Sequence, residues 1–497
     1  MKNTHIARRN IFASGLLICA ALAACIGLTA CATNPATKQH DFVMLSEEQE
    51  LQLGQRAAAE IEKNLPLMDS NDPLVRYVDS VGQKVAAVSD RPNLFYRFHV
   101  VDNATINAFA LPGGYIYIHR GLLIHMNSEA ELAAVLGHEI GHVTARHAVK
   151  QYSKAQAYQL GSMVASIFLP IPQGAGVFSD LMASAVLHGF GRDAELQADQ
   201  LSIRYLSRAG YDPHATIGIL KTLKRLDDIN SKEKTDAGDK VEQYHGAFST
   251  HPETAKRIED AVALAASNQV KTGFTNRNSL LTAINGAAYG DSAKQGAVVG
   301  RRFLHPDLGI QMSFPEDWVI TNTPAELQAR LRQQKVFFRF SLKELVKRQS
   351  ASELLRKGFP KRHLGSIDTG MQAGMPFAHG EADISAPHVG QAKVAAYVFL
   401  SGSKAYVMMM WSKRDVFYRY RPIFADIAHS LRSYDVERDG DIPRIALHIW
   451  KKSDSWAVLA NKNHHILGRF TADKLAALNG MENGEQPHPG EMIKTLR

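Results

Sequence analysis

Two histidines and a glutamate, His138, Glu139 and His142, lie close enough in the chain to build a metal-dependent hydrolytic site. Their neighbours follow a helical pattern of apolar residues, and four helical residues advance the chain by about 400° and 6 Å. Both imidazoles therefore leave one face of the expected helix, at the spacing of two corners of a zinc tetrahedron. Glu139 can take a proton from a zinc-bound water without binding the metal. A helix with two surface histidines and an exposed glutamate is the alternative.

Zinc needs a third protein ligand, and cysteine cannot supply it. All three cysteines lie within the first 31 residues, in or at the end of an expected leader. The next acidic helix has Glu195 and Asp199 four residues apart and so on one face. One carboxylate can bind the metal while the other hydrogen-bonds a ligand histidine. From spacing alone, a solvated run of charges explains these two residues equally well.

The leader combines a positive start with an apolar run from Ile11 to Leu28, which is short and interrupted by glycine. It predicts a secretory signal over residues 1–30. The segment Leu28–Cys31 resembles the lipobox of bacterial lipoproteins, in which the cysteine is acylated and becomes the mature N-terminus. The resemblance implies lipidation of Cys31, and Ala32 after it implies sorting to the outer membrane. Ordinary cleavage at a small-x-small site is the alternative.

Composition divides the rest of the chain into expected domains. A tether over residues 31–45 precedes a region of helices and short strands over 46–270. A segment rich in Asn, Gly, Ala and Ser predicts a linker over 271–300. Residues 301–437 mix strands with helices, which predicts an α+β domain of unassigned role. Residues 438–497 form a small tail unit.

Hydrophobic residues make up 45% of the 497 residues and charged residues 21%, which is typical of a globular protein. The formal net charge of +8 is mild for a chain of this length, so we expect no nucleic-acid partner. An apolar segment over residues 158–190 is broken by prolines and glycines. It is too interrupted to span a bilayer and predicts a mobile lid or a surface hairpin.

The H-E-x-x-H motif and the later Arg192-x-x-Glu195-x-x-Ala-Asp199 pattern together resemble the gluzincin family of the CAAX prenyl endopeptidases. The similarity is greatest to the BepA-like periplasmic quality-control metalloproteases, and it covers about residues 45–266. Gly191 stands where this family usually has a serine before the arginine, a difference that touches no ligand.

The resemblance implies a helical gluzincin protease domain with a small edge-strand sheet and one zinc ion per chain. It makes His138, His142 and Glu195 the metal ligands and Glu139 the general base. It makes Asp199 the carboxylate that supports a ligand histidine.

A segment ending in Pro-Gly-Gly is similar to the family's sequence before its substrate-binding edge strand. The resemblance assigns that strand to Gly114, Tyr115, Ile116 and Tyr117. An exposed strand edge can hold an extended peptide by main-chain pairing, whatever its sequence. A plain hairpin strand is the alternative.

Two further histidines lie close to these motifs. The segment Ser249–Ile258 resembles the family's T-H-P-x-x-x-x-R-I sequence near the cleft. His251 is accordingly expected to be a fourth, inhibitory ligand or an oxyanion stabiliser, and a histidine that caps a helix is the alternative. His147 lies five residues past His142, so we expect it to point elsewhere and to be structural.

The tail resembles a divergent LysM module, a βααβ fold, in the segments Asp454–Trp456, Lys474–Gly480 and Pro489–Lys494. LysM domains typically bind glycans that contain N-acetylglucosamine, so the resemblance implies peptidoglycan as a partner. A degenerate copy used only for packing is the alternative. The helical repeats that follow the protease domain in the BepA-like proteins have no counterpart here.

These patterns predict a mainly α+β zinc endopeptidase of the bacterial periplasm, anchored to the outer membrane by lipidated Cys31. By resemblance its substrates are unfolded or misassembled envelope proteins, and release of the lid or of His251 would gate its activity. The competing hypothesis is a lipid-anchored envelope binding or assembly protein with a vestigial or latent metal site and a glycan-binding tail. An intact general base at Glu139 argues against a purely structural site.

Overall fold

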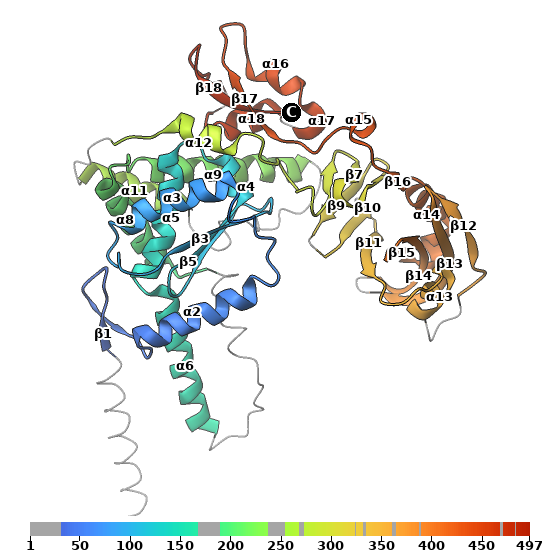
Figure 1. The fold of residues 1–497 in the computed structure, drawn as a ribbon, viewed down its shortest axis with the longest axis horizontal. Coiled ribbons are helices and arrows are strands. Elements are labelled where there is room, and N and C mark those ends of the chain that lie inside the picture. Colours follow the sequence, from blue (N-terminus) through green and yellow to red (C-terminus); the bar gives the residue numbers. More distant parts are fainter. Residues whose placement is uncertain are drawn as a thin grey trace, which may run out of the picture. The chain divides into compact units, whose positions relative to one another are not determined.

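The computed structural model describes most of the chain after the expected leader (Figure 1). The described residues are 31–166, 189–236, 254–267 and 273–497, with short gaps at 324, 332–333, 360–363, 387–388, 468–470 and 483. The expected signal segment, most of the expected lid and His251 lie outside these residues. No described helix has the length and apolar character needed to cross a membrane.

The chain forms two compact units. The first comprises residues up to Asn285 together with the tail segments Leu447–Trp456 and Ala472–Lys494. The second comprises Gly286–Ala446 and two short tail segments. Both units mix helices and strands, which confirms the predicted α+β class.

A three-stranded sheet lies at the centre of the first unit. Its strands are β3 (Arg97–Val101), β4 (Ala108–Leu111) and β5 (Tyr115–His119), in the order β3-β5-β4. β3 runs parallel to β5, and β4 pairs with β5 through a tight turn at Gly113 and Gly114, whose φ angles are 79° and 91°. The prediction that residues 114–117 form an edge strand is therefore wrong, because β5 pairs with β3 on one side and with β4 on the other. No described strand pairs with the outer edge of β4, so β4 is the strand with a free edge.

Helix α5 (Glu129–Thr144) crosses the first unit beside this sheet and is buried in 15 of its 16 residues, with only Val135 partly exposed. It begins at Ser128, whose hydroxyl accepts a hydrogen bond from the Glu131 amide. A helix buried on nearly every side needs neighbours all round it. The other helices of the unit are α2 (Glu47–Ile61), α3 (Pro73–Ala86), α4 (Arg120–His125), α6 (His147–Ser166), α8 (Arg192–Ala209), α9 (Ala215–Asp236), α11 (Thr254–Ser267) and α12 (Arg277–Ile284).

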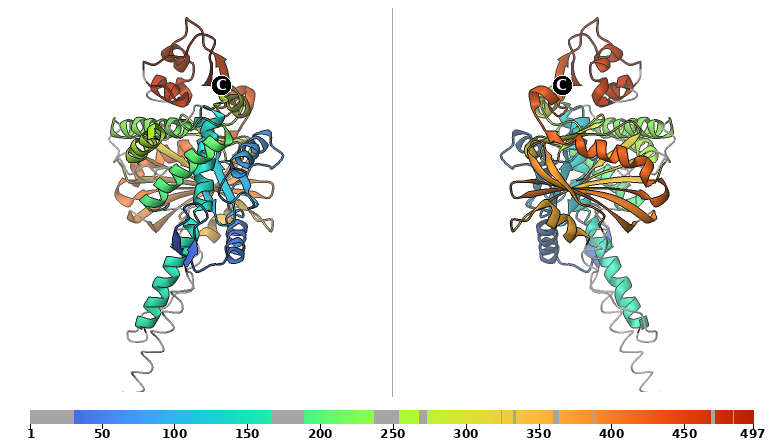
Figure 2. Two further views of the ribbon diagram at one scale, coloured as in Figure 1. Left: turned by 90° about the vertical axis from the view of Figure 1, so that its left-hand side faces the viewer. Right: turned by 90° about the vertical axis from the view of Figure 1, so that its right-hand side faces the viewer.

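The second unit is built on a seven-stranded antiparallel sheet in the order β12-β13-β14-β15-β11-β10-β9. A four-stranded sheet, β16-β8-β7-β6, belongs to the same unit. Its core joins one face of the larger sheet to α14 (Arg414–His429), which lies across that face (Figure 2, right). The remaining elements are β6 (Ala297–Val299), β7 (Arg302–His305), β8 (Ile310–Ser313), β9 (Trp318–Asn322), β10 (Leu327–Leu331), β11 (Val336–Glu344), α13 (Ala351–Gly358), β12 (Asp368–Gln372), β13 (Met375–Ala386), β14 (Gly390–Ser401), β15 (Lys404–Lys413), β16 (Arg432–Ser433) and α15 (Val436–Asp439). The expected linker thus holds α12 and β6.

The tail has two paired strands, β17 (Ile445–Ile449) and β18 (Met492–Leu496). The described residues between them form three short helices, α16 (Trp456–Asn461), α17 (His464–Leu467) and α18 (Thr471–Leu478), instead of the two expected. β1 (Cys31–Thr33) and β2 (His40–Phe42) form a small hairpin at the start of the described chain.

Lys494 holds the tail segment Ala472–Lys494 in place within the first unit. Its side chain is fully buried, and its Nζ donates to the carbonyl oxygens of Ile124 at 2.9 Å and Met126 at 2.7 Å. Asn479 holds the Lys494 backbone by a reciprocal pair of hydrogen bonds. Burial lowers the pKa of Lys494 and raises the pKa of the neighbouring Glu131. The segment Ala472–Lys494 is therefore packed against the turn that leads into α5.

Replacing Lys494 with methionine tests this attachment. We expect a loss of about 3 kcal/mol in the free energy of unfolding, because two buried carbonyl oxygens lose the amine that donates to both of them. Urea unfolding measures the change. Lys452→Met, an exposed tail position, should stay within about 0.5 kcal/mol of the wild type. Equal stabilities for the two variants would show that the Lys494 contacts do not hold the tail.

Candidate metal centre

Three buried side chains from two helices converge on one point. α5 supplies His138 and His142, and α8 supplies Glu195. The two Nε2 atoms lie 3.0 Å apart, and the Glu195 carboxylate oxygens lie 3.4 Å from Nε2 of His138 and 3.5 Å from Nε2 of His142. Zinc bonds of 2.0–2.1 Å in a tetrahedron separate neighbouring ligand atoms by about 3.3 Å. Two imidazoles and a carboxylate at these separations fit a zinc ion, and the fourth position can take water or substrate.

Small residues on α5 let the two helices approach closely enough for this. A Cβ atom on Gly141 would lie 3.2 Å from the Ala198 carbonyl and from Leu201 Cβ, both on α8. A Cβ atom on Gly137 would lie 3.2 Å from the hydroxyl of Ser202. That hydroxyl also donates to the Ala134 carbonyl at 2.7 Å, which ties the helices together.

Asp199 holds His138 in the orientation that a metal needs. The distance from Asp199 Oδ1 to Nδ1 of His138 is 2.9 Å, so a proton on Nδ1 leaves the lone pair of Nε2 for the metal. Arg257 of α11 donates to both oxygens of Asp199 at 2.7 Å, in a bidentate pair. Burial alone would raise the pKa of Asp199, but Arg257 and His138 outweigh it and hold the pKa at about 2.

The same balance of charge favours a cation at His138. Burial lowers the pKa of His138, but Asp199 and Glu195 more than compensate and raise it to about 9. An environment that stabilises a proton on this imidazole also stabilises a metal ion bound to it, and the two compete.

His147 holds His142, contrary to the expectation that it points elsewhere. Its Nδ1 lies 2.8 Å from Nδ1 of His142, and its Nε2 lies 2.8 Å from Oε1 of Gln197. The expectation assumed a continuous helix, but α5 ends at Thr144 and Arg146 has a φ of 56°, which turns the chain sharply back. His147 is thereby brought against the metal site.

Only one set of tautomers satisfies this chain of contacts. Gln197 Oε1 can only accept, so Nε2 of His147 donates and its Nδ1 accepts. His142 then donates from Nδ1 and keeps the lone pair of Nε2 for the metal. Burial lowers the pKa of His147 to about 4, so this imidazole stays neutral as the chain requires.

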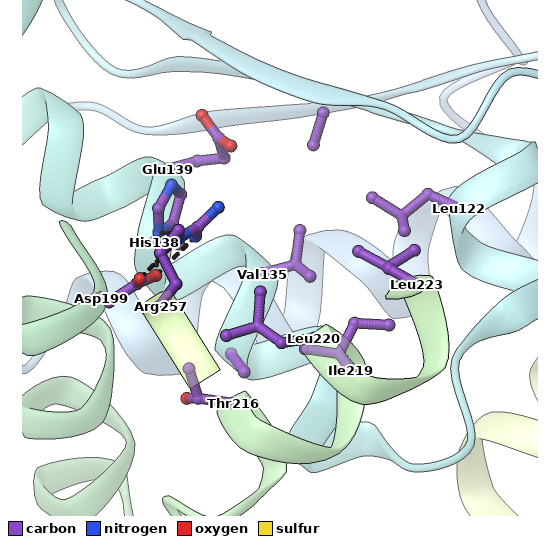
Figure 3. Close-up of a pocket in the computed structure, with 12 residues that line it drawn as sticks. Leu122, Val135, His138, Glu139, Asp199, Thr216, Ile219, Leu220, Leu223 and Arg257 are labelled. Carbon is purple, nitrogen blue, oxygen red and sulfur yellow. Dashed lines mark hydrogen bonds and ion pairs between the residues drawn. The ribbon is translucent and has the colours of Figure 1, made fainter. Parts of the chain in front are cut away.

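Glu139 is buried one residue after His138, at one end of a cavity of about 60 Å³ (Figure 3). Leu122, Val135 and Leu223 line this cavity with other aliphatic side chains. Ala108 of β4 lines it too, so the free strand edge lies beside the general base. The cavity can hold an apolar side chain next to the candidate metal.

The other expected site residues behave differently. Tyr117 is buried and donates to Glu62 at 2.6 Å, and Ile116 is buried in the sheet, so β5 has a structural role. His251 cannot be placed, because it lies outside the described residues. Arg257 had no role assigned from the sequence, although the T-H-P-x-x-x-x-R-I pattern contained it. His147 and Gln197 gave no recognisable sequence signal as a pair.

His147→Ala tests the hydrogen-bond chain. We expect zinc affinity to fall by about 10–100-fold, because His142 loses the acceptor that fixes its tautomer. Competition with a chromogenic chelator measures the affinity without any substrate. His147→Gln keeps an acceptor oxygen and should retain more of the affinity. His214→Ala, at an exposed histidine, should change nothing. If His147→Ala binds zinc as tightly as the wild type, His147 does not support the metal site.

Comparison with known proteins places this centre in a family. The model of Peptidase family M48 matches residues 74–265. The beta-barrel assembly-enhancing protease of Yersinia pestis is 31% identical over 236 residues, which cover 46% of this chain and 46% of that protein. The corresponding Escherichia coli protein is 29% identical, with 44% of each chain covered. This chain therefore spans about half the length of these relatives.

The mitochondrial metalloendopeptidase OMA1 of Schizosaccharomyces pombe is 31% identical over 240 residues, which cover 48% of this chain and 67% of that protein. The region matched by the family model contains His138, Glu139, His142, Glu195 and Asp199, which form the buried centre described above. On the matched motifs, the shared region and this geometry, the chain belongs to peptidase family M48.

Proposed function

We propose that the protein is a zinc-dependent endopeptidase. The observation that carries this proposal is the position of Glu139. It is a buried carboxylate on the metal-binding helix, beside a His/His/Glu donor set with zinc-like separations. A structural zinc site is closed by four protein ligands and has no use for a neighbouring base. The metalloendopeptidases among the relatives support the same activity.

A bound zinc ion would polarise the peptide carbonyl and acidify a water at the fourth position. Glu139 accepts the proton of the attacking water and delivers it to the leaving nitrogen. Asp199 with Arg257 and Gln197 with His147 hold the two ligand histidines, so that each presents Nε2. Preset ligands keep the reacting groups aligned as charge develops.

The surroundings favour an extended, unfolded chain as substrate. Among the described residues, no strand pairs with the outer edge of β4, so a peptide in the extended conformation can add there as a further strand. The aliphatic cavity beside Glu139 suits an apolar side chain next to the scissile bond. Folded proteins bury such side chains and pair their backbone, so exposed segments are preferred. Unfolded or misassembled envelope proteins fit these demands. The names of the bacterial relatives and the lipobox-like segment that ends at Cys31 support a location in the cell envelope.

Glu139→Gln is the first test of the proposed activity. We expect the variant and the wild type, both from residue 32 to 497, to bind one zinc each. Cleavage of an unfolded protein should fall by about a thousandfold or more in the variant, because the amide cannot accept the proton. Metal analysis and gel-based proteolysis give the two readouts. Zinc binding without cleavage by the wild type would favour the competing envelope-binding hypothesis.

Leu223→Gln tests the apolar cavity. A buried amide in place of the branched aliphatic end of the leucine should lower kcat/KM for peptides with a large aliphatic residue next to the scissile bond by about tenfold, and for alanine there by much less. Lys224→Gln, exposed on the next position of α9, is the matched control. Cleavage sites read by mass spectrometry from a peptide mixture would show the shift. If Leu223→Gln prefers the same residues next to the scissile bond as the wild type, the cavity does not select the substrate.

A further inference from the structure

The large sheet of the second unit curls around a cavity that the peptidase chemistry does not use. Residues of β9, β10, β11, β15 and β13 all line one hollow of about 600 Å³. β13 and β9 are five strand positions apart in the sheet order, which is about 24 Å in a flat sheet. A hollow of this size can reach both only if the sheet bends between them, as Figure 1 shows. We call this hollow the cup.

The floor of the cup is apolar. Phe337 and Trp411 are partners across β11 and β15, and their rings stack with centroids 5.6 Å apart. Met409 and Ile384 extend this surface on either side. All four side chains are partly exposed, whereas the alternate residues of the same strands form the buried core under α14. α13 covers the other end of this face but leaves the cup open.

Two arginines border the apolar floor. Arg330 faces Phe337 across β10 and β11, and Arg339 lies two residues further along β11, so the arginines are diagonal neighbours on one face. Glu326 binds Nε of Arg339 at 2.7 Å and steadies its side chain. None of the described residues that line the cup is a carboxylate. Thr321, Gln328 and Ser385 complete the polar part of the lining.

We propose that the cup binds a single-chain amphiphile with an anionic headgroup, a carboxylate or a phosphate. The volume lies in the range of about 300–1,000 Å³ that is typical of small-molecule sites. The apolar floor takes the chain, and the two arginines take the headgroup through paired N–H donors.

A peptide fits this surface less well. Strands β10, β11 and β15 are each paired on both sides within the sheet, so their backbone groups are already bonded. A peptide laid across the cup would find no main-chain partners there, and its own polar groups would be buried against aromatic rings. A hydrocarbon chain has no such groups to satisfy.

Binding of dodecanoate and of dodecyl phosphate to the whole chain from residue 32 to 497, below their micelle concentrations, tests the proposal by calorimetry. Dodecanol and dodecyltrimethylammonium keep the chain and change the headgroup, while acetate and inorganic phosphate keep the anion and lose the chain. We expect an anionic amphiphile to bind at least about tenfold more tightly than all four, because only it uses both parts of the cup. The preferred anion identifies the headgroup.

Variants then locate the site. Arg330→Gln with Arg339→Gln should weaken binding by about tenfold or more, and Ile384→Glu should weaken it similarly by placing a carboxylate at the floor. Arg301→Gln, at an exposed arginine of the same unit, should leave binding unchanged. Circular dichroism verifies that each variant is folded.

Four outcomes would each overturn the proposal. They are equally tight binding of the neutral or cationic analogue, an equal loss of binding in Arg301→Gln, preferential binding of an acidic peptide, and no binding at all. Zinc content and proteolysis are measured separately, so the peptidase proposal stands or falls on its own.

Discussion

The close approach of α5 to α8 is the constraint on which the metal centre depends. Two ligands lie on one helix and the third on the other, so the interhelical distance sets the ligand separations. Gly137 and Gly141 bring the backbones together where a side chain would hold them apart. The centre is rigid because this contact is part of the protein core, where packing density leaves little room for adjustment.

That packing creates an electrostatic problem, since it buries carboxylates and imidazoles together. Unpaired buried charge is costly, so the charges near the metal come with partners. Asp199 is neutralised by the bidentate Arg257 and linked to His138. The His142 side is held by neutral groups, His147 and Gln197. One ligand histidine is thus supported by an ion pair and the other by a neutral chain, which leaves the net charge of the cluster balanced against a divalent cation.

The sequence predicted those parts of the centre that depend on local geometry. Residues four apart on a helix share a face wherever that helix lies, so a metal-binding role for His138 and His142 could be proposed without a fold. Spacing alone left Glu195 and Asp199 equally well explained as a solvated run of charges, and their separate roles came from the family resemblance. Contacts between residues far apart in the chain could not be predicted in this way. The position of β5 inside the sheet depends on β3 joining it from an earlier part of the chain. The place of His147 depends on one residue with positive φ, at Arg146, and Arg257 arrives from a helix far along the chain.

Contacts from the C-terminal part of the chain hold the N-terminal end of the same helix, α5. Lys494 donates to carbonyls at the end of α4 and in the turn before Ser128, and Arg277 donates to the Asn127 carbonyl in that turn. These carbonyls precede the first turn of α5, so the hydrogen bonds from Lys494 and Arg277 fix the point at which the metal-binding helix begins. A fixed end limits how far the buried helix can shift, and the histidines lie about two and a half and three and a half turns further along it. The C-terminal segment that sequence patterns present as a separate module is therefore, in part, a support for the metal-binding helix.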